Sequence, residues 1–354
     1  MITSYSAVIT NECAAYDKSS GIFTCQICGT YVFSWTIASS QHHQTTADLL
    51  VNDVSVGSTA TYPRGSESDN LKGSSTGFVV YNLKVGDKVR VILNGTAIGK
   101  FSTFSGWKLQ HDTPSFYARA STNLKGSVFR ASKVGFKFQN VLTNNGDVYN
   151  PDNGVITIPE TGVWALTISA EVSTGFDCLS VGKPHIHPRI WIFLKEDTSS
   201  SLIFRNLSYG DRLFWYSSYN ETLTATRSSI SGWLIGPTNS RPLFMASSDS
   251  PTSSPVDFTW EYIDQTDSLL GSEFQASKSG VYLIFWNTID KEMVVTTLMV
   301  NDKEAGRAVT SISQHSYMDN GSNFAILRLQ KNDVITIKTN TSSDYVSISG
   351  YFLF

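Results

Sequence analysis

The sequence predicts an all-β protein made of three β-sandwiches in tandem, and three observations support this fold class. Of the 354 residues, 41% are hydrophobic, 12% are aromatic and only 16% are charged, so a core can form and disorder is not expected. No long stretch places apolar residues at helical spacing, whereas Ser, Thr, Gly, Tyr and Val are abundant. One strand pattern also occurs three times, which indicates an internal repeat.

The repeated strand follows Gly29, Gly162 and Gly280. In each copy the second, fourth and sixth residues after the glycine are large: Tyr31, Phe33 and Trp35; Trp164, Leu166 and Ile168; Tyr282, Ile284 and Trp286. Alternation with period two places these side chains on one face of a half-buried strand.

The first repeat covers residues 1–110 and opens with short strands at 8–11, 16–17 and 22–25. After the glycine strand at 29–37 we expect strands at 49–52, 78–81, 89–93 and 104–107. The Gly- and Ser-rich residues 57–73 predict a loop, and the Gly-Asp pair at 86–87 predicts a tight turn.

The second repeat, residues 113–237, and the third, residues 241–354, follow the same order. Both begin with an additional strand, at 116–120 and 243–246, that the first repeat lacks. The first repeat is therefore expected to leave a sheet edge unpaired. The connectors, residues 110–114 and 236–240, span at most about 18 Å each, so the repeats must pack close together.

These motifs together resemble one known family. In the first repeat they are Tyr16-Asp17, the glycine strand, the turn Gly86-Asp87 and the closing Ser105-Gly106-Trp107. The combination resembles the globular head of complement C1q, whose fold the tumour necrosis factor superfamily shares. The resemblance implies ten-stranded jelly-roll sandwiches that assemble as trimers. Three heads on one chain then predict a monomeric protein that forms a single-chain, pseudo-threefold trimer.

Charge and targeting signals limit the choice of partners and location. A net charge of -3 gives no electrostatic basis for binding nucleic acid. No apolar run is long enough to span a bilayer, and no signal peptide is visible at the amino terminus. The family resemblance nevertheless implies a secreted, extracellular protein.

Calcium is the ion that the resemblance implies, because several C1q-like proteins hold it near the apex of the trimer. Carboxylates in the matching loops are Glu67, Asp69 and Asp319, and hard oxygen ligands suit calcium. A weaker metal candidate is the pair His185 and His187, for which a solvated surface pair is the alternative. Otherwise we expect no cofactor.

The four cysteines are Cys13, Cys25, Cys28 and Cys178. Cys25 and Cys28 have the spacing of a redox or zinc pair, but no second pair accompanies them. Packing cysteines or one ordinary disulfide is the simpler interpretation, with the pairing left open.

Catalytic motifs are weak in this chain. The Gly-x-Ser-x-Gly run at 73–77 precedes a strand instead of joining a strand to a helix, so it does not fit a nucleophile elbow. Asp87, Asp211 and Asp333 recur at one turn position and are expected to accept backbone N–H bonds. No nucleophile or acid–base pair emerges, so we expect a protein that is not an enzyme.

The predicted function is recognition of a carbohydrate, microbial-surface or protein ligand, as in lectin-like C1q-domain proteins of innate immunity. The alternative is a secreted structural, matrix or body-fluid protein that binds calcium. The ligand itself is not indicated by any residue pattern.

Overall fold

The computed structural model describes residues 5, 7–40, 44–63, 72–125, 135–171, 177–182, 192–194, 198–217, 222–238, 241–248, 254–258, 260–264, 269–311 and 319–354. Only the backbone is described for 177–182, 192–194, 217, 260–264 and 269–270. The all-β prediction is confirmed: besides strands, the described residues form only the short 3-10 helices η1 (Glu12–Ala14) and η2 (Gly99–Phe101). No helix among them is long and apolar enough to cross a membrane.

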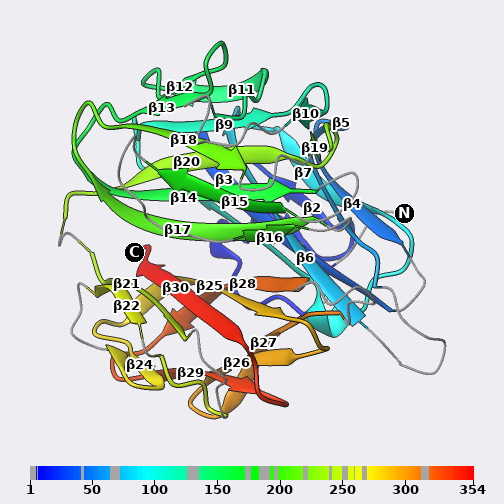
Figure 1. Cartoon of the computed structure of the whole chain (residues 1–354), viewed down its shortest axis with the longest axis vertical. Helices are drawn as coiled ribbons and strands as arrows, with labels where there is room; N and C mark the ends of the chain where they lie inside the picture. The colour runs from blue at the N-terminus through cyan, green and yellow to red at the C-terminus, as the bar shows by residue number, and fades with distance from the viewer. Residues whose placement is uncertain are drawn as a thin grey trace.

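The strands fall into three consecutive groups, and no sheet mixes strands of two groups (Figure 1). The first group is β1 (Tyr16–Asp17), β2 (Ile22–Thr24), β3 (Gly29–Ser40), β4 (Thr45–Val51), β5 (Val54–Thr61), β6 (Lys72–Leu83), β7 (Lys88–Asn94) and β8 (Thr103–Lys108). It forms a five-stranded sheet, β1-β2-β7-β4-β5, and a three-stranded sheet, β6-β3-β8.

The second group contains β9 (Ser115–Arg119), β10 (Leu124–Lys125), β11 (Asn140–Asn145), β12 (Tyr149–Asn150), β13 (Val155–Thr157), β14 (Gly162–Ala170), β15 (Asp177–Gly182), β16 (Ile192–Leu194), β17 (Ser199–Leu207), β18 (Arg212–Ser217), β19 (Thr222–Leu223) and β20 (Ser229–Gly236). Its two large sheets have the orders β11-β9-β20-β14-β17 and β12-β13-β18-β15-β16, and β10 pairs with β19.

The third group contains β21 (Leu243–Ser248), β22 (Trp260–Asp264), β23 (Leu269–Leu270), β24 (Glu273–Gln275), β25 (Gly280–Asp290), β26 (Val295–Val300), β27 (Lys303–Val309), β28 (Asp319–Leu329), β29 (Val334–Thr339) and β30 (Tyr345–Phe352). Its sheets are β22-β21-β30-β25-β28 and β23-β24-β29-β26-β27. Thus the second and third groups share one strand order, and the first group matches it without two strands.

The glycine strands β3, β14 and β25 each lie in the middle of a sheet, between the strand that precedes the Gly/Asn-Asp turn and the strand that closes the group. Their alternating residues are almost fully buried: Trp35 is 1% exposed, and Trp164 and Trp286 are 0% exposed. Trp35 and Trp164 belong to one continuous apolar core that the first and second groups share, and Trp286 belongs to a core within the third group.

The prediction of a loop over residues 57–73 is wrong at both ends, and residues 64–71 lie outside the described part. Strand β5 continues to Thr61, and β6 begins at Lys72. A Cβ built on Gly57 would lie 2.7 Å from the Trp35 ring and 2.6 Å from Val79. The glycine is therefore inside a strand because the indole packs directly on its backbone, not because the chain turns there. Ser75 is likewise buried in β6, which leaves no nucleophile elbow.

The groups also pack against one another. In Figure 1 the third group, coloured yellow to red, lies below the other two, and β28 contacts both β6 and β17. Phe78 of β6 lies 5.8 Å from the rings of both Phe285 and Phe324 of the third group. Such ring contacts bury apolar surface that a single sandwich would expose.

Candidate functional site at the contacts between the strand groups

The closing strands β8, β20 and β30 bring three aromatic side chains together. Trp107, Trp233 and Tyr351 each follow the closing glycine of their group. The rings of Trp107 and Trp233 lie 5.8 Å apart, and the indole Nε1 of Trp233 donates to the Tyr351 hydroxyl at 3.1 Å. The sequence interpretation of these residues as core or interface aromatics therefore agrees with their contacts.

Burial raises the pKa of Tyr351 well above its ordinary value, and the smaller effects of Trp233, Arg241 and Trp107 only lower it in part. The hydroxyl thus stays protonated at physiological pH. The three aromatics line a cavity of about 250 Å³ to which all three groups contribute, and its lining includes Lys108 and Arg241. Arg241 is held there by a 3.0 Å hydrogen bond from its Nη1 to the carbonyl oxygen of Leu353.

At residues 74–76 of β6 the contact between the groups is polar. The hydroxyls of Thr76 and Ser322 are 3.0 Å apart, and Ser200 donates to the carbonyl oxygen of Thr76, so all three groups meet at this threonine. Ser74 donates to the carbonyl oxygen of Val309 at 3.1 Å. These buried hydroxyls have partners, as buried polar groups require.

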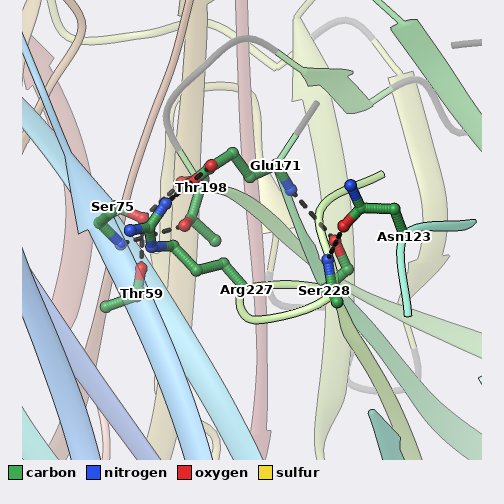
Figure 2. A network of polar contacts seen from close by, with 9 residues as sticks. Thr59, Ser75, Asn123, Glu171, Thr198, Arg227 and Ser228 are labelled. Carbon is green, nitrogen blue, oxygen red and sulfur yellow. Dashed lines mark hydrogen bonds and ion pairs between the residues drawn. The ribbon is translucent and has the colours of Figure 1, made fainter. Parts of the chain in front are cut away.

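Figure 2 shows an ion pair of the second group, Glu171 with Arg227, together with polar groups at the contact between the first and second groups. Nη1 of Arg227 donates to Oε1 and Oε2 of Glu171 at 2.8 and 2.7 Å. The Glu171 side chain is 8% exposed and the Arg227 side chain is 23% exposed. The pair is therefore largely removed from water, and part of the Arg227 side chain remains accessible.

Hydroxyl groups of the first group lie next to this ion pair in Figure 2. The Thr59 and Ser75 hydroxyls are 2.6 Å apart, and Ser75 donates to the carbonyl oxygen of Thr198 in the second group. Thr198 Oγ1 in turn accepts the backbone N–H of Ala60 at 3.0 Å. Charged groups of the second group and hydroxyl groups of both groups thus lie at this contact.

The strand registers identify the equivalent residues of the other groups. Ser34, Thr167 and Phe285 lie opposite Ser105, Ser231 and Ser349, the residues before the three closing glycines. Four residues further along each glycine strand, and four residues earlier in each closing strand, lie three equivalent pairs. They are Ala38 with Phe101, Glu171 with Arg227, and Ile289 with Tyr345.

Only one of these pairs is charged. Ala38 and Phe101 belong to an apolar cluster that also contains Val309 of the third group. Ile289 lies directly opposite Tyr345. The Glu171–Arg227 ion pair therefore stands where the other two groups have apolar or aromatic residues, which makes this interface chemically distinct.

Of the predicted calcium ligands, only Asp319 lies within the described residues. The structure places it at the start of strand β28, 4% exposed, instead of in a loop. Its Oδ2 accepts hydrogen bonds from the backbone N–H and, at 2.7 Å, from the hydroxyl of Ser311. Glu67, Asp69, His185 and His187 lie outside the described residues. Within the part that is described, no three His, Cys, Asp or Glu side chains form a metal site.

The described cysteines Cys13, Cys25 and Cys28 are free thiols. Cys25 is buried and its Sγ contacts the carbonyl oxygen of Ile27 at 3.3 Å, whereas Cys13 and Cys28 are exposed. Burial raises the pKa of the Cys25 thiol. The side chain of Cys178 lies outside the described residues.

The recurring turn aspartates behave as structural residues. Oδ2 of Asp87, Asp211 and Asp333 each accepts the backbone N–H three residues earlier, at 2.8 Å in every case. Hydrogen bonds from Asn52 and from the Lys84 backbone lower the pKa of Asp87 below its ordinary value. This arrangement closes a turn.

Sequence reasoning missed the Glu171–Arg227 pair. The two residues are 56 positions apart, and no local pattern joins them. The available signal was the repeat itself: an alignment of the closing strands shows a charge where the other copies have Phe101 and Tyr345.

Part of this chain is similar to known proteins. Residues 1–109 match the C1q domain. The globular domain of the zebrafish complement 1qA protein is 18% identical and covers 32% of this chain and 98% of its own length, with a TM-score of 0.29. Murine APRIL is 12% identical over 32% of this chain and 99% of its own, with a TM-score of 0.29. Eiger TNF from S. frugiperda is 11% identical over 35% and 94%, with a TM-score of 0.29. Residues 1–109 of this chain are therefore similar to the C1q domain.

Proposed function

We propose that this chain is a non-enzymatic, secreted recognition protein that binds a carbohydrate, microbial-surface or protein ligand at the Glu171–Arg227 interface. The observation that carries the proposal is the presence of this ion pair at only one of three equivalent positions. Burying a carboxylate and a guanidinium is often no more stabilising than an apolar pair of similar volume. The apolar residues Ala38 and Phe101 make an adequate contact at the equivalent position, so stability alone gives no reason for the charges.

The chemistry of the interface suits a hydroxyl-rich or carboxylate-bearing ligand. The Arg227 side chain is partly exposed. A guanidinium is a planar fork of donors, which recognises carboxylates and paired hydroxyls. Glu171 fixes the orientation of that fork through both of its oxygens. An oriented donor at the contact between two groups is the kind of group that gives a binding site its specificity.

We also propose that residues 1–110, 113–237 and 241–354 are three C1q-like domains forming a pseudo-threefold trimer within one chain. The equal strand orders of the second and third groups and the meeting of Trp107, Trp233 and Tyr351 support this arrangement. Light scattering is expected to give the single-chain mass of 39 kDa. A mass near three times this value would count against it.

Calcium remains part of the proposal through Glu67, Asp69 and Asp319. Asp319 already accepts two hydrogen bonds from Ser311, so calcium binding there would require this carboxylate to use its other oxygen or to move. We therefore place the main calcium contribution on Glu67 and Asp69.

Binding to glycan and microbial-surface arrays, with and without calcium, tests the proposed function. The informative variant is Glu171→Ala/Arg227→Phe, which installs the pair found in the first group and so preserves packing. We expect wild-type protein to bind selectively and this variant to lose at least tenfold in affinity while melting near the wild-type temperature. Equal binding by both proteins would move the ligand site elsewhere. A featureless array for the wild type would favour the structural or matrix role.

A further inference from the structure

The cavity of about 250 Å³ beside Trp107, Trp233 and Tyr351 is enclosed by all three strand groups. The first group contributes the end of β8 and the residues after it, the second group contributes the second half of β20, and the third group contributes the end of β30 and Arg241. Arg227 precedes the first residue of β20, at the opposite end of that strand. The cavity is therefore separate from the Glu171–Arg227 interface.

Indole rings and aliphatic side chains form the apolar walls of this cavity. The rings of Trp107 and Trp233 meet edge to face at 69°, and Trp107 stacks on Phe324 with ring centroids 5.5 Å apart. Trp107 is 6% exposed and Trp233 is 0% exposed, so neighbouring side chains hold both rings in place. Leu109 and Ile235 add aliphatic surface. Walls of this kind accept a flat apolar group.

The indole of Trp107 carries a buried donor that has no acceptor. Its Nε1 makes no hydrogen bond, whereas the equivalent Nε1 of Trp233 donates to the Tyr351 hydroxyl at 3.1 Å. Buried polar groups are nearly always paired, with protein atoms or with a bound molecule. An unpaired N–H on a side chain that lines a cavity therefore indicates an acceptor that lies within the cavity.

The Tyr351 hydroxyl provides a second donor beside the first. It accepts the N–H of Trp233, and the described part of the chain offers no acceptor for its own proton. Burial raises the pKa of Tyr351, so the hydroxyl keeps this proton at neutral pH. Trp107 and Arg241 each lower that pKa in part, which places both side chains close to the hydroxyl. Donors from three residues are thus gathered at one part of the cavity.

The charged side chains of the lining are cationic. The lining contains Arg241 and Lys108 but no Asp or Glu. Nη1 of Arg241 donates to the carbonyl oxygen of Leu353, and a guanidinium has further N–H groups to offer. Lys108 contributes less, because a Cβ on Gly29 would lie 2.5 Å from its Cε, so the side chain runs along β3. Arg241 is therefore the main source of positive charge near Tyr351.

We propose that this cavity binds a small aromatic carboxylate. The carboxylate accepts hydrogen bonds from the Trp107 N–H and the Tyr351 O–H, and Arg241 balances its charge. The aromatic ring packs against the two indoles and the aliphatic wall. Hydrogen bonds to an ionised acceptor are stronger than those between neutral groups.

The volume of the cavity limits the size of the ligand. A cavity of about 150 Å³ holds benzene, so about 250 Å³ has room for a two-ring system with one carboxylate. Such a ligand contacts all three strand groups at once. Because a ligand that binds only the folded chain stabilises it, occupation of the cavity should hold the three groups together.

The test is calorimetric titration of the full chain with 1-naphthoate and with its neutral analogue 1-naphthamide. We expect one naphthoate per chain and an affinity at least tenfold higher than for naphthamide. The indole N–H resonance of Trp107, identified by its loss in Trp107→Phe, should shift on addition of naphthoate. Equal affinity for the two probes, or no binding of naphthoate at millimolar concentration, would overturn the proposal.

Variants of the donor residues locate the binding. Arg241→Gln should weaken naphthoate binding at least fivefold without affecting naphthamide, and Arg241→Lys should recover part of the loss. The matched control is Arg212→Gln, which removes an exposed arginine outside the lining and should bind as the wild type does. Trp107→Phe keeps a ring but loses the N–H, and it should also weaken naphthoate binding at least fivefold.

Thermal melting shows whether these variants fold, and naphthoate should raise the melting temperature of the wild type more than that of Arg241→Gln. Unchanged naphthoate affinity in both Arg241→Gln and Trp107→Phe would place the binding elsewhere and overturn the proposal. The variant Glu171→Ala/Arg227→Phe should bind naphthoate as the wild type does. Loss of naphthoate binding in that variant would contradict a separate site.

Discussion

Trp233 and Tyr351 belong to different strand groups, yet the indole N–H of one donates to the hydroxyl of the other at 3.1 Å in a fully buried setting. The bond joins the ends of β20 and β30. Because both residues follow a closing glycine, the contact links two equivalent points of the repeat.

Removing this hydroxyl should weaken the contact between groups. Tyr351→Phe leaves the Trp233 N–H buried without its acceptor, which costs about 1–3 kcal/mol. Urea unfolding measures the loss. The matched control is Tyr282→Phe, whose hydroxyl bonds the backbone of the exposed Lys278 and the side chain of Ser277, and it should cost less. Equal losses for the two variants would contradict a special role for the Trp233–Tyr351 bond.

Breaking the Glu171–Arg227 pair on one side should be costly. Arg227→Met leaves a buried carboxylate without its partner and is expected to destabilise the chain by about 3 kcal/mol. The double variant Glu171→Ala/Arg227→Phe replaces both charges and should stay within about 1 kcal/mol of the wild type. Chemical denaturation of the wild type, Arg227→Met and the double variant measures the free energy of unfolding of each. A double variant as unstable as the single one would show that the position of Glu171 and Arg227 does not accept apolar residues.

Acid should remove part of the stability through Asp87. Its pKa is lowered below the ordinary 3.8 in the folded state, so its contribution is complete above that value and is lost as the pH falls through the lower folded pKa. Unfolding midpoints between pH 5 and pH 2 should therefore fall less steeply for Asp87→Asn than for the wild type. Parallel curves would mean that the turn carboxylate is not stabilising.

The three described thiols should differ in reactivity. Cys13 and Cys28 are exposed, and Cys25 is buried with a raised pKa, which keeps it protonated and shielded. Timed alkylation of native protein followed by peptide mass mapping should label Cys13 and Cys28 at least tenfold faster. Rapid labelling of Cys25 would show that the turn before β3 opens readily.

Asp319 should contribute to stability independently of calcium. Asp319→Ala removes the acceptor for the Ser311 N–H and hydroxyl, with an expected cost of about 1–3 kcal/mol in chelator and in calcium alike. If calcium binds at Glu67 and Asp69, calcium raises the melting temperature of the wild type but not of Asp69→Ala. No calcium effect on the intact protein would remove that ion from the proposal.

The strand order was predictable because each strand carries its own signal. Alternation identified β3, β14 and β25, and the Gly-Asp or Asn-Asp pairs identified the turns before β7, β18 and β29. Gly57 misled the prediction, since glycine marks a turn and a close approach of a ring equally well. Only the packing of Trp35 distinguishes the two.

The site was less predictable than the fold. Asp319 reads as a loop carboxylate in sequence, but its partner Ser311 is eight residues away and places it in a buried strand end. Glu171 and Arg227 are far apart in the sequence, so the residues around either one do not predict that they form a pair. Contacts of this kind depend on the strand register, because a shift of one residue would turn these side chains to the other face of the sheet.

A protein assembled from identical chains repeats every interface, but here the three positions equivalent to Glu171 and Arg227 hold different residues. A ligand that depends on this pair meets it once per molecule. Its binding curve should then have one site, and multivalent capture of a surface would require several chains to be brought together.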